Sequence, residues 1–130
     1  MWALLLAPTR SHACQVSASD LLVQTENVFY YPDVVVSCDP SDDDRIERNP
    51  CFIVEVLSPT TARFDRHEKR YAYCAVSTMQ DYWIVDPASK VIEVWTRGPE
   101  GRTGSHYTAG DPLRVACIDL TLKVVDIVGP

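Results

Sequence analysis

Apolar residues in this chain fall mostly into short runs and alternating stretches, a pattern typical of β-strands. The strongest run covers residues 51–57 and is interrupted only by Glu55. Such a run predicts a strand near the centre of a sheet that is covered on both faces. A second run, residues 34–36, consists of valine alone and follows Pro32. Because proline cannot donate to a strand ladder, we expect this strand to begin just after it.

The rest of the pattern adds shorter strands and one helix. Further strands are predicted at residues 14–25, 82–85, 91–95, 105–108 and 113–116. A charged segment predicts a helix over residues 65–76, in which Asp65 is the N-cap and Glu68 completes a capping box. Residues 120–128 are apolar with a mixed period, which fits either a helix or a strand. This order predicts one α+β domain, with α/β-like features, over residues 1–130: a mixed central sheet with a flanking helix.

Composition narrows the class of protein. The chain has 130 residues, 46% of them hydrophobic, and a net charge of −6. An acidic chain of this kind does not hold nucleic acid by bulk charge, so any such contact requires a local basic patch. The apolar start, residues 2–7, is too short to span a bilayer and lacks the basic residues of a signal peptide. We therefore expect a cytoplasmic protein with no membrane contact.

Five cysteines are spread along the chain without any C-x-x-C pair. They are Cys14, Cys38, Cys51, Cys74 and Cys117. An odd number at wide spacing does not indicate a small disulfide-bonded scaffold or a zinc motif. The expectation is therefore buried thiols in a reducing compartment.

Glu55 is the residue that most needs an explanation, because a charge inside a buried strand is costly unless it is paired. Asp33 lies at the start of the neighbouring valine strand, 22 positions earlier. If the two strands pair, their carboxylates meet, and two such groups ionise together only with a cation between them. Oxygen ligands of this kind suit Mg²⁺ or Mn²⁺. The alternative is that Asp33 caps the strand end and Glu55 pairs with a structural Arg or Lys.

The predicted helix adds further candidates. Lys69 shares a helix face with Asp65 and Tyr73, so it can act beside a carboxylate pair or form a surface ion pair with Asp65. Glu68 falls on the apolar stripe of the helical wheel and is either the capping-box partner or an inward carboxylate. The cap is the favoured interpretation. This acidic chain also has one dense cluster of basic residues, which either binds the phosphate backbone of a nucleic acid or forms a solvated helix face. Its members are Arg63, Arg66, His67, Lys69 and Arg70.

Taken together, these motifs resemble a known family. The segments YYPDVVV, FIVEVLSPTT and DYWIVDP, with Asp65, Glu68, Lys69 and Tyr73 between the last two, are similar to the Uma-two family. That family belongs to the PD-(D/E)XK superfamily of restriction-endonuclease-like folds. The resemblance runs from about Cys14 to the C-terminus. It implies a restriction-endonuclease-like core and a Mg²⁺- or Mn²⁺-dependent site for phosphodiester hydrolysis, with DNA as substrate.

Residue roles follow from this resemblance. Asp33 and Glu55 match the acidic positions of the motif and would be both catalytic residues and metal ligands. Leu57 stands where the superfamily usually has its lysine, and Lys69 matches the lysine that Uma-two members carry on the next helix. Tyr73 matches a tyrosine whose role in the family is undefined, and Asp65 matches a residue of the family's turn. The resemblance also implies that the chain forms a homodimer.

One departure bears on activity. Family members usually begin with a longer N-terminal region, including a helix whose glutamate completes the site. Residues 1–13 are then the remnant of a helical region, and the core is N-terminally shortened. Two functions stay open: a metal-dependent endonuclease, or a catalytically impaired structural domain that dimerises or binds a partner. Another metal hydrolase using the same carboxylates is a more remote third.

Overall fold

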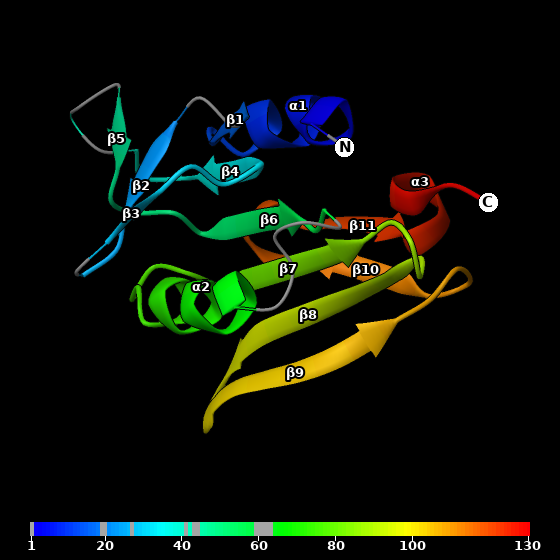
Figure 1. Ribbon diagram of the computed structural model, residues 1–130. Helices are drawn as coiled ribbons and strands as arrows, with labels where there is room; N and C mark the ends of the chain where they lie inside the picture. Colours follow the sequence, from blue (N-terminus) through cyan, green and yellow to red (C-terminus); the bar gives the residue numbers. More distant parts are fainter. Residues whose placement is uncertain (1, 19–20, 27, 41, 43–44, 59–63) are drawn as a thin grey trace.

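The computed structural model describes residues 2–18, 21–26, 28–40, 42, 45–58 and 64–130. Its centre is a six-stranded mixed sheet in the order β1-β4-β6-β7-β8-β9 (Figure 1). The strands are β1 (Gln15–Ala18), β4 (Val34–Ser37), β6 (Phe52–Val56), β7 (Asp81–Asp86), β8 (Val91–Gly98) and β9 (Gly101–Tyr107). The central pair β6–β7 is parallel and the other pairs are antiparallel. A parallel pair requires a crossover connection, and helix α2 (Phe64–Cys74) lies within it.

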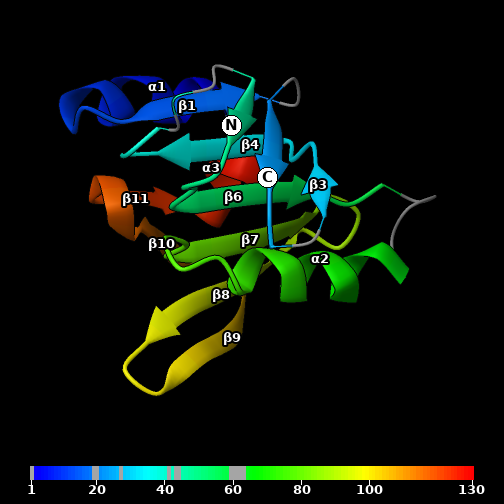
Figure 2. The ribbon, with the colours of Figure 1, turned by 90° about the vertical axis from the view of Figure 1, so that its left-hand side faces the viewer.

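The two faces of the sheet are covered by different elements (Figure 2). Helix α2 lies on one face, together with a small sheet of β3 (Phe29–Tyr30), β2 (Leu22–Gln24) and β5 (Ile46–Glu47). The opposite face carries α1 (Trp2–Ser11), the hairpin of β10 (Pro112–Val115) and β11 (Leu120–Lys123), the short 3₁₀ helix η1 (Ala116–Ile118) and α3 (Val124–Val128). Each face has its own buried apolar cluster. The central strands are therefore covered on both sides, as their apolar runs predict.

Strand β6 divides its side chains between the two clusters. Phe52 and Val54 belong to the cluster beside α1 and α3, whereas Ile53 belongs to the cluster beneath α2. Alternation along the strand then directs Glu55 to the α2 side. The fold thus places this carboxylate between the sheet and the helix that carries Lys69.

Most of the predicted elements are confirmed. The mixed sheet and its flanking helix are present, and the helix, expected at residues 65–76, is α2 at Phe64–Cys74. The ambiguous residues 120–128 contain both structures, β11 followed by α3. Residues 2–11 form α1. No helix in the described ranges is long and apolar enough to cross a bilayer.

The expectation that all five cysteines are thiols is wrong. Cys14 and Cys38 form a disulfide, while Cys51, Cys74 and Cys117 are thiols. The physical reason is strand register: β1 pairs antiparallel with β4 and Gln15 lies opposite Ser37. The next pair outward is Cys14 and Cys38, which antiparallel geometry brings within bonding range.

Candidate active site

The paired strands β4 and β6 bring the two predicted carboxylates together. Val34 lies opposite Val54 in this antiparallel ladder, so the adjoining positions, Asp33 and Glu55, face each other across the strands. Directly opposite residues have Cβ atoms about 5 Å apart. The two side chains interact closely enough for Asp33 to perturb the ionisation of Glu55. The sequence-based expectation of a carboxylate pair matches this geometry.

Helix α2 supplies the two groups that contact Glu55. The Tyr73 hydroxyl donates a hydrogen bond to Glu55 Oε1 at 3.0 Å, and the Lys69 ammonium lies 3.8 Å from Oε2. Lys69 and Tyr73 are four positions apart, so both project from the same face of the helix. Tyr73 is completely buried and Glu55 is only 8% exposed. The carboxyl group is therefore held from one side by a neutral donor and from the other by a cation.

Burial governs the ionisation of Glu55. Removal from water raises its pKa to about 7 from the usual 4.5, and the nearby Asp33 adds to that rise. Lys69 and the Tyr73 hydrogen bond act in the opposite direction and lower the pKa. The pKa of Tyr73 is itself raised by burial and by Glu55, so its hydroxyl stays protonated and keeps its donor role.

Asp33 is held by the backbone of the neighbouring strand. The Val56 amide donates a hydrogen bond to Asp33 Oδ2 at 2.6 Å. This contact and the Tyr73 contact each engage one oxygen of a carboxyl group. Oε2 of Glu55 faces the Lys69 ammonium, so a metal ion held by this carboxylate would share that oxygen with Lys69.

The donor set fits the divalent cation that the motif predicts. Two carboxyl groups converge, one of them buried with a raised pKa, and a hard cation would offset that repulsion. Asp33 and Glu55 would hold Mg²⁺ or Mn²⁺. Water and substrate oxygens would complete the coordination, as Mg²⁺ sites commonly allow.

Tyr30 is a site residue that the sequence interpretation missed. Its ring lies 5.3 Å from the Tyr73 ring, and the Lys69 ammonium lies 5.7 Å from its centroid. Lys69 thus has an aromatic face on one side and a carboxylate on the other. The only available signal was the position of Tyr30 within YYPDVVV, three residues before Asp33.

Two expectations on α2 are wrong. Asp65 is not an N-cap, because it lies inside the helix, whose described part begins at Phe64. Glu68 does not point inward: its side chain is exposed and accepts a hydrogen bond from Tyr30 at 3.2 Å. The buried face instead follows Lys69, Tyr73 and Val76, because the helix packs its lysine and tyrosine against Glu55.

The predicted basic cluster is only partly open to solvent. Arg66 forms an ion pair with Glu93 at 3.0 Å, and the Arg70 guanidinium stacks on Trp95 at 4.5 Å from the ring centroid. Arg63 lies outside the described residues. Arg70 and Trp95 also line a cavity of about 430 Å³ beside α2.

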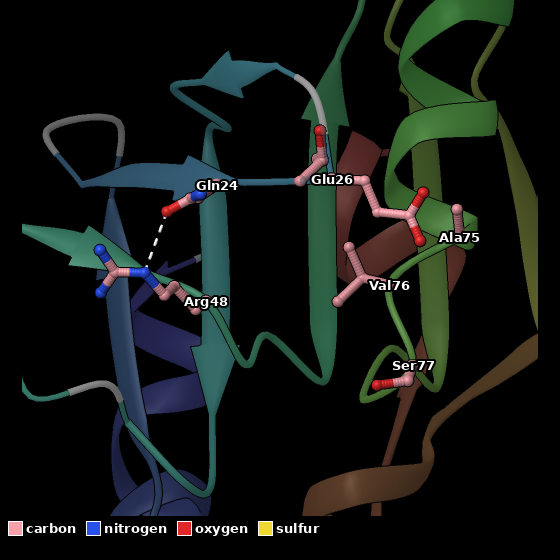
Figure 3. A pocket seen from close by; sticks show the side chains of 7 residues that line it. Gln24, Glu26, Arg48, Ala75, Val76 and Ser77 are labelled. Carbon is pink, nitrogen blue, oxygen red and sulfur yellow. Dashed lines mark hydrogen bonds between the residues drawn. The ribbon is translucent and has the colours of Figure 1, made fainter.

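Another cavity, of about 270 Å³, lies between β2 and the end of α2 (Figure 3). Arg48 there donates to Gln24 at 2.9 Å, and Glu26 is the single acidic residue of its lining. It lacks a carboxylate pair and includes neither Asp33 nor Glu55. The candidate carboxylate pair at the ends of β4 and β6 is thus separate from this cavity.

Comparison with known proteins places these features in a family. A family model named Uma2 and described as "Putative restriction endonuclease" matches residues 1–124. The chain belongs to the Uma2 family.

Two relatives from Synechocystis sp. match parts of the chain. "Uncharacterized protein slr1290" is 36% identical over 116 residues, covering 85% of this chain and 61% of the relative. "Uncharacterized protein sll1609" is 32% identical over 81 residues, covering 59% of this chain and 46% of the relative. The Uma2 chain described here therefore spans less than two thirds of the length of either relative.

A solved structure shares the fold. It is described as the crystal structure of a putative nuclease belonging to DUF820 from Anabaena variabilis. The match has a TM-score of 0.78 and 16% identity, and covers 98% of this chain and 75% of the other. The Uma2 chain thus has the α+β, restriction-endonuclease-like fold that the sequence predicts.

Proposed function

We propose that this Uma2 protein is a divalent-metal-dependent endonuclease of the PD-(D/E)XK type, with DNA as its substrate. One observation carries the proposal: Asp33 and Glu55 face each other across β4 and β6, with the Lys69 ammonium 3.8 Å from Glu55. The family match, described as "Putative restriction endonuclease", supports phosphodiester chemistry at this site.

Each side chain has a distinct task in this mechanism. Asp33 and Glu55 hold the cation, which supplies Lewis-acid polarisation of the scissile phosphate. Tyr73 fixes the orientation of Glu55 by its hydrogen bond to Oε1. Lys69 lies beside Glu55 and carries a positive charge. It would donate to a phosphoryl oxygen and stabilise the charge that develops there, or orient the attacking water.

Substrate approach is proposed along α2. Arg66 and Arg70 lie on the same helix as Lys69, and Arg63 precedes that helix in the sequence. Arg70, stacked on Trp95, is a cation on this helix that would contact a phosphate backbone. Binding through such contacts would weaken steeply as the salt concentration rises.

The decisive experiment is a cleavage assay on supercoiled plasmid with Mn²⁺ or Mg²⁺. Wild-type protein should nick the plasmid, chelation should stop cleavage, and Glu55→Gln should abolish it. Glu68→Gln is the matched control, because that glutamate is exposed and lies outside the carboxylate pair. Equal cleavage by wild type and Glu55→Gln would overturn the proposal, since the carboxylate would then be dispensable.

A binding or assembly domain is the second candidate, favoured by large apolar side chains that stay exposed. Phe29 is 51% exposed, Tyr31 61% and Tyr71 71%. Apolar groups gathered at a surface are often covered by a partner, and a second copy of this chain would form a homodimer. Light scattering on the purified chain tests this: a dimer that Phe29→Ser and Tyr31→Ser together convert to monomer supports it. A chain that stays monomeric at high concentration argues against it.

A further inference from the structure

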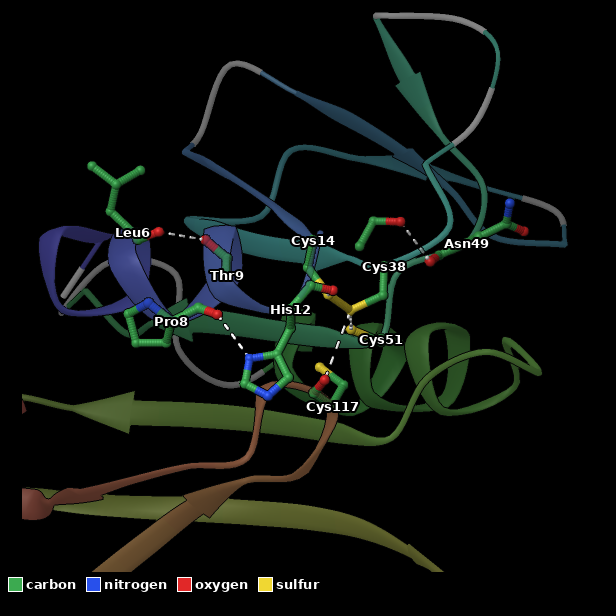
Figure 4. Close-up of a disulfide and its surroundings, with 10 residues drawn as sticks. Leu6, Pro8, Thr9, His12, Cys14, Cys38, Asn49, Cys51 and Cys117 are labelled. Carbon is green, nitrogen blue, oxygen red and sulfur yellow. Dashed lines mark hydrogen bonds between the residues drawn. A yellow bond between two sulfur atoms is a disulfide. The ribbon is translucent and has the colours of Figure 1, made fainter.

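Four of the five cysteines gather at the opposite end of β6 from Glu55 (Figure 4). Cys14 precedes β1, Cys38 follows β4, Cys51 precedes β6, and Cys117 lies in η1. The sulfur atoms of Cys38, Cys51 and Cys117 all lie within 4.8 Å of one another. Cys14 joins them through its disulfide with Cys38. Four separate elements therefore converge on one group of sulfur atoms.

The separation of the Cys38 and Cys51 sulfurs matches that of two ligands in a tetrahedral metal centre. Zinc–thiolate bonds of about 2.3 Å in a tetrahedron place neighbouring sulfurs about 3.8 Å apart. The Sγ atoms of Cys38 and Cys51 are 3.8 Å apart. Four cysteine ligands are a common structural zinc set, whereas oxygen-preferring cations such as Mg²⁺ do not select sulfur.

The surroundings also suit such a centre. Cys14 and Cys51 are each 7% exposed and belong to the apolar cluster beside α1 and α3. On the other side, Cys38, Cys51 and Cys117 line a cavity of about 410 Å³. The cluster thus has a fixed, low-dielectric wall and an open side through which an ion can enter.

We propose that the reduced chain binds one Zn²⁺ ion through Cys14, Cys38, Cys51 and Cys117, and that the Cys14–Cys38 disulfide is the oxidised, metal-free form of this site. A dithiol reduces the disulfide by giving it two electrons and two protons, and itself becomes a cyclic disulfide. Zinc then replaces the four thiol protons, which pass to solvent, and its oxidation state stays +2. Rotation about the Cα–Cβ bonds of Cys14 and Cys38 separates their sulfurs.

A thiol–disulfide relay is the main competing role for these residues. It would require Cys51 to attack the Cys38 sulfur as a thiolate. Zinc binding also requires deprotonated thiols, so the two roles are separated by the metal content of the reduced chain rather than by the ionisation of Cys51.

Metal binding by the phosphine-reduced full chain tests the proposal. After equilibration with micromolar Zn²⁺ and gel filtration, elemental analysis should find one zinc per chain. Substitution of Co²⁺ should give the thiolate charge-transfer absorption of a four-sulfur site. Cys51→Ser and Cys117→Ser should each weaken zinc affinity by about tenfold or more.

Matched controls separate this site from other metal ligands. Cys74→Ser changes a thiol outside the cluster, and His12→Ala removes the nearby imidazole that Figure 4 shows; both should retain full zinc content. Glu55→Gln should also retain it, which excludes binding at the carboxylate pair. Circular dichroism verifies folding, and Cys117→Ser, at a half-buried position, serves if Cys51→Ser does not fold. A folded, reduced chain without zinc, or undiminished zinc in both cysteine variants, overturns the proposal.

Discussion

The two ends of β6 carry opposite coordination chemistry. Glu55 at one end faces Asp33 and Lys69, while Cys51 just before the other end lies among sulfur atoms. Glu55 lies four positions after Cys51, about 13 Å along the strand. One end offers hard oxygen ligands and the other soft sulfur ligands, so different cations should be selected at each. A single rigid strand thus separates a candidate reactive centre from a candidate structural one.

The two regions also differ in how the chain assembles them. The carboxylate site draws on residues 30–73, from β3 through β4 and β6 to α2. The sulfur cluster draws on Cys14 through Cys117, which span most of the sequence. Disturbing the sulfur end should therefore affect global stability, and disturbing the acidic end should affect activity with smaller effects on stability. The following predictions test that division, from the largest expected effect to the smallest.

Loss of the proposed zinc should give the largest effect on stability. At free zinc about 1,000 times Kd, binding to the folded state adds about 4 kcal/mol to the free energy of unfolding. Cys51→Ser in reductant should lose this increment, as measured by urea unfolding with and without zinc. Cys74→Ser should respond to zinc like the wild type. Plasmid cleavage per folded molecule should stay unchanged in both, and a parallel loss of cleavage would contradict the division.

Lys69→Met tests the acidic end directly. Removing the ammonium beside Glu55 should lower the rate of plasmid cleavage by about 10²–10³-fold, as for other groups that stabilise transition-state charge. Zinc content should not change. Lys123→Met is the control, since Lys123 lies on β11 at the other face of the sheet. Equal rates for Lys69→Met and wild type would remove the lysine from the mechanism.

Glu55→Gln should stabilise the metal-free protein at alkaline pH. Because the folded-state pKa is about 7 and the usual value is 4.5, the protonated form favours folding, and its contribution is lost as pH rises through 7. The variant should match wild type near pH 4 and exceed it by about 3 kcal/mol above pH 7. Thermal unfolding in a chelator at several pH values measures this, with exposed Glu68→Gln as a control. If the difference in stability between Glu55→Gln and wild type does not change with pH, the ionisation of Glu55 is not coupled to folding.

Tyr73→Phe should give the smallest effect. Losing the donor to a buried carboxylate costs about 1–2 kcal/mol above pH 7, and it should raise the pKa of Glu55 further, since the Tyr73 hydrogen bond lowers it. The pH at which stability changes should therefore move upward. Tyr71→Phe, at an exposed position, should leave the profile unchanged, and an unshifted profile in Tyr73→Phe would mean that the hydroxyl does not control Glu55.

The sequence was informative where residue types conflict with their surroundings. Glu55 stands out inside an apolar run, and Pro32 marks where the valine strand begins, so the carboxylate pair could be predicted from the pattern. The partners on α2 were harder. A helical wheel puts Glu68 on an apolar stripe with Tyr71 and nearby alanines, yet in the folded chain Lys69 and Tyr73 are the residues that turn inward and contact Glu55.

The sulfur cluster had no comparable signal. Buried cysteines are ordinary core residues, and ligands from four elements leave no local spacing motif. Only the register of β1 on β4 and the position of η1 bring them together. The place of Tyr30 in the site could not be predicted for the same reason. Its contacts with Lys69 and Tyr73 depend on how the small sheet lies beside α2.

Gly104 on β9 has a consequence for mutational tolerance and labelling. It is exposed on the last strand of the sheet, so it looks like a position open to any residue. A Cβ atom there would come within 2.7 Å of the Trp95 ring, and that ring supports Arg70. Saturation mutagenesis should therefore find this surface position restricted to glycine, and a fluorophore or spin label attached there would report on a displaced tryptophan rather than on the native surface.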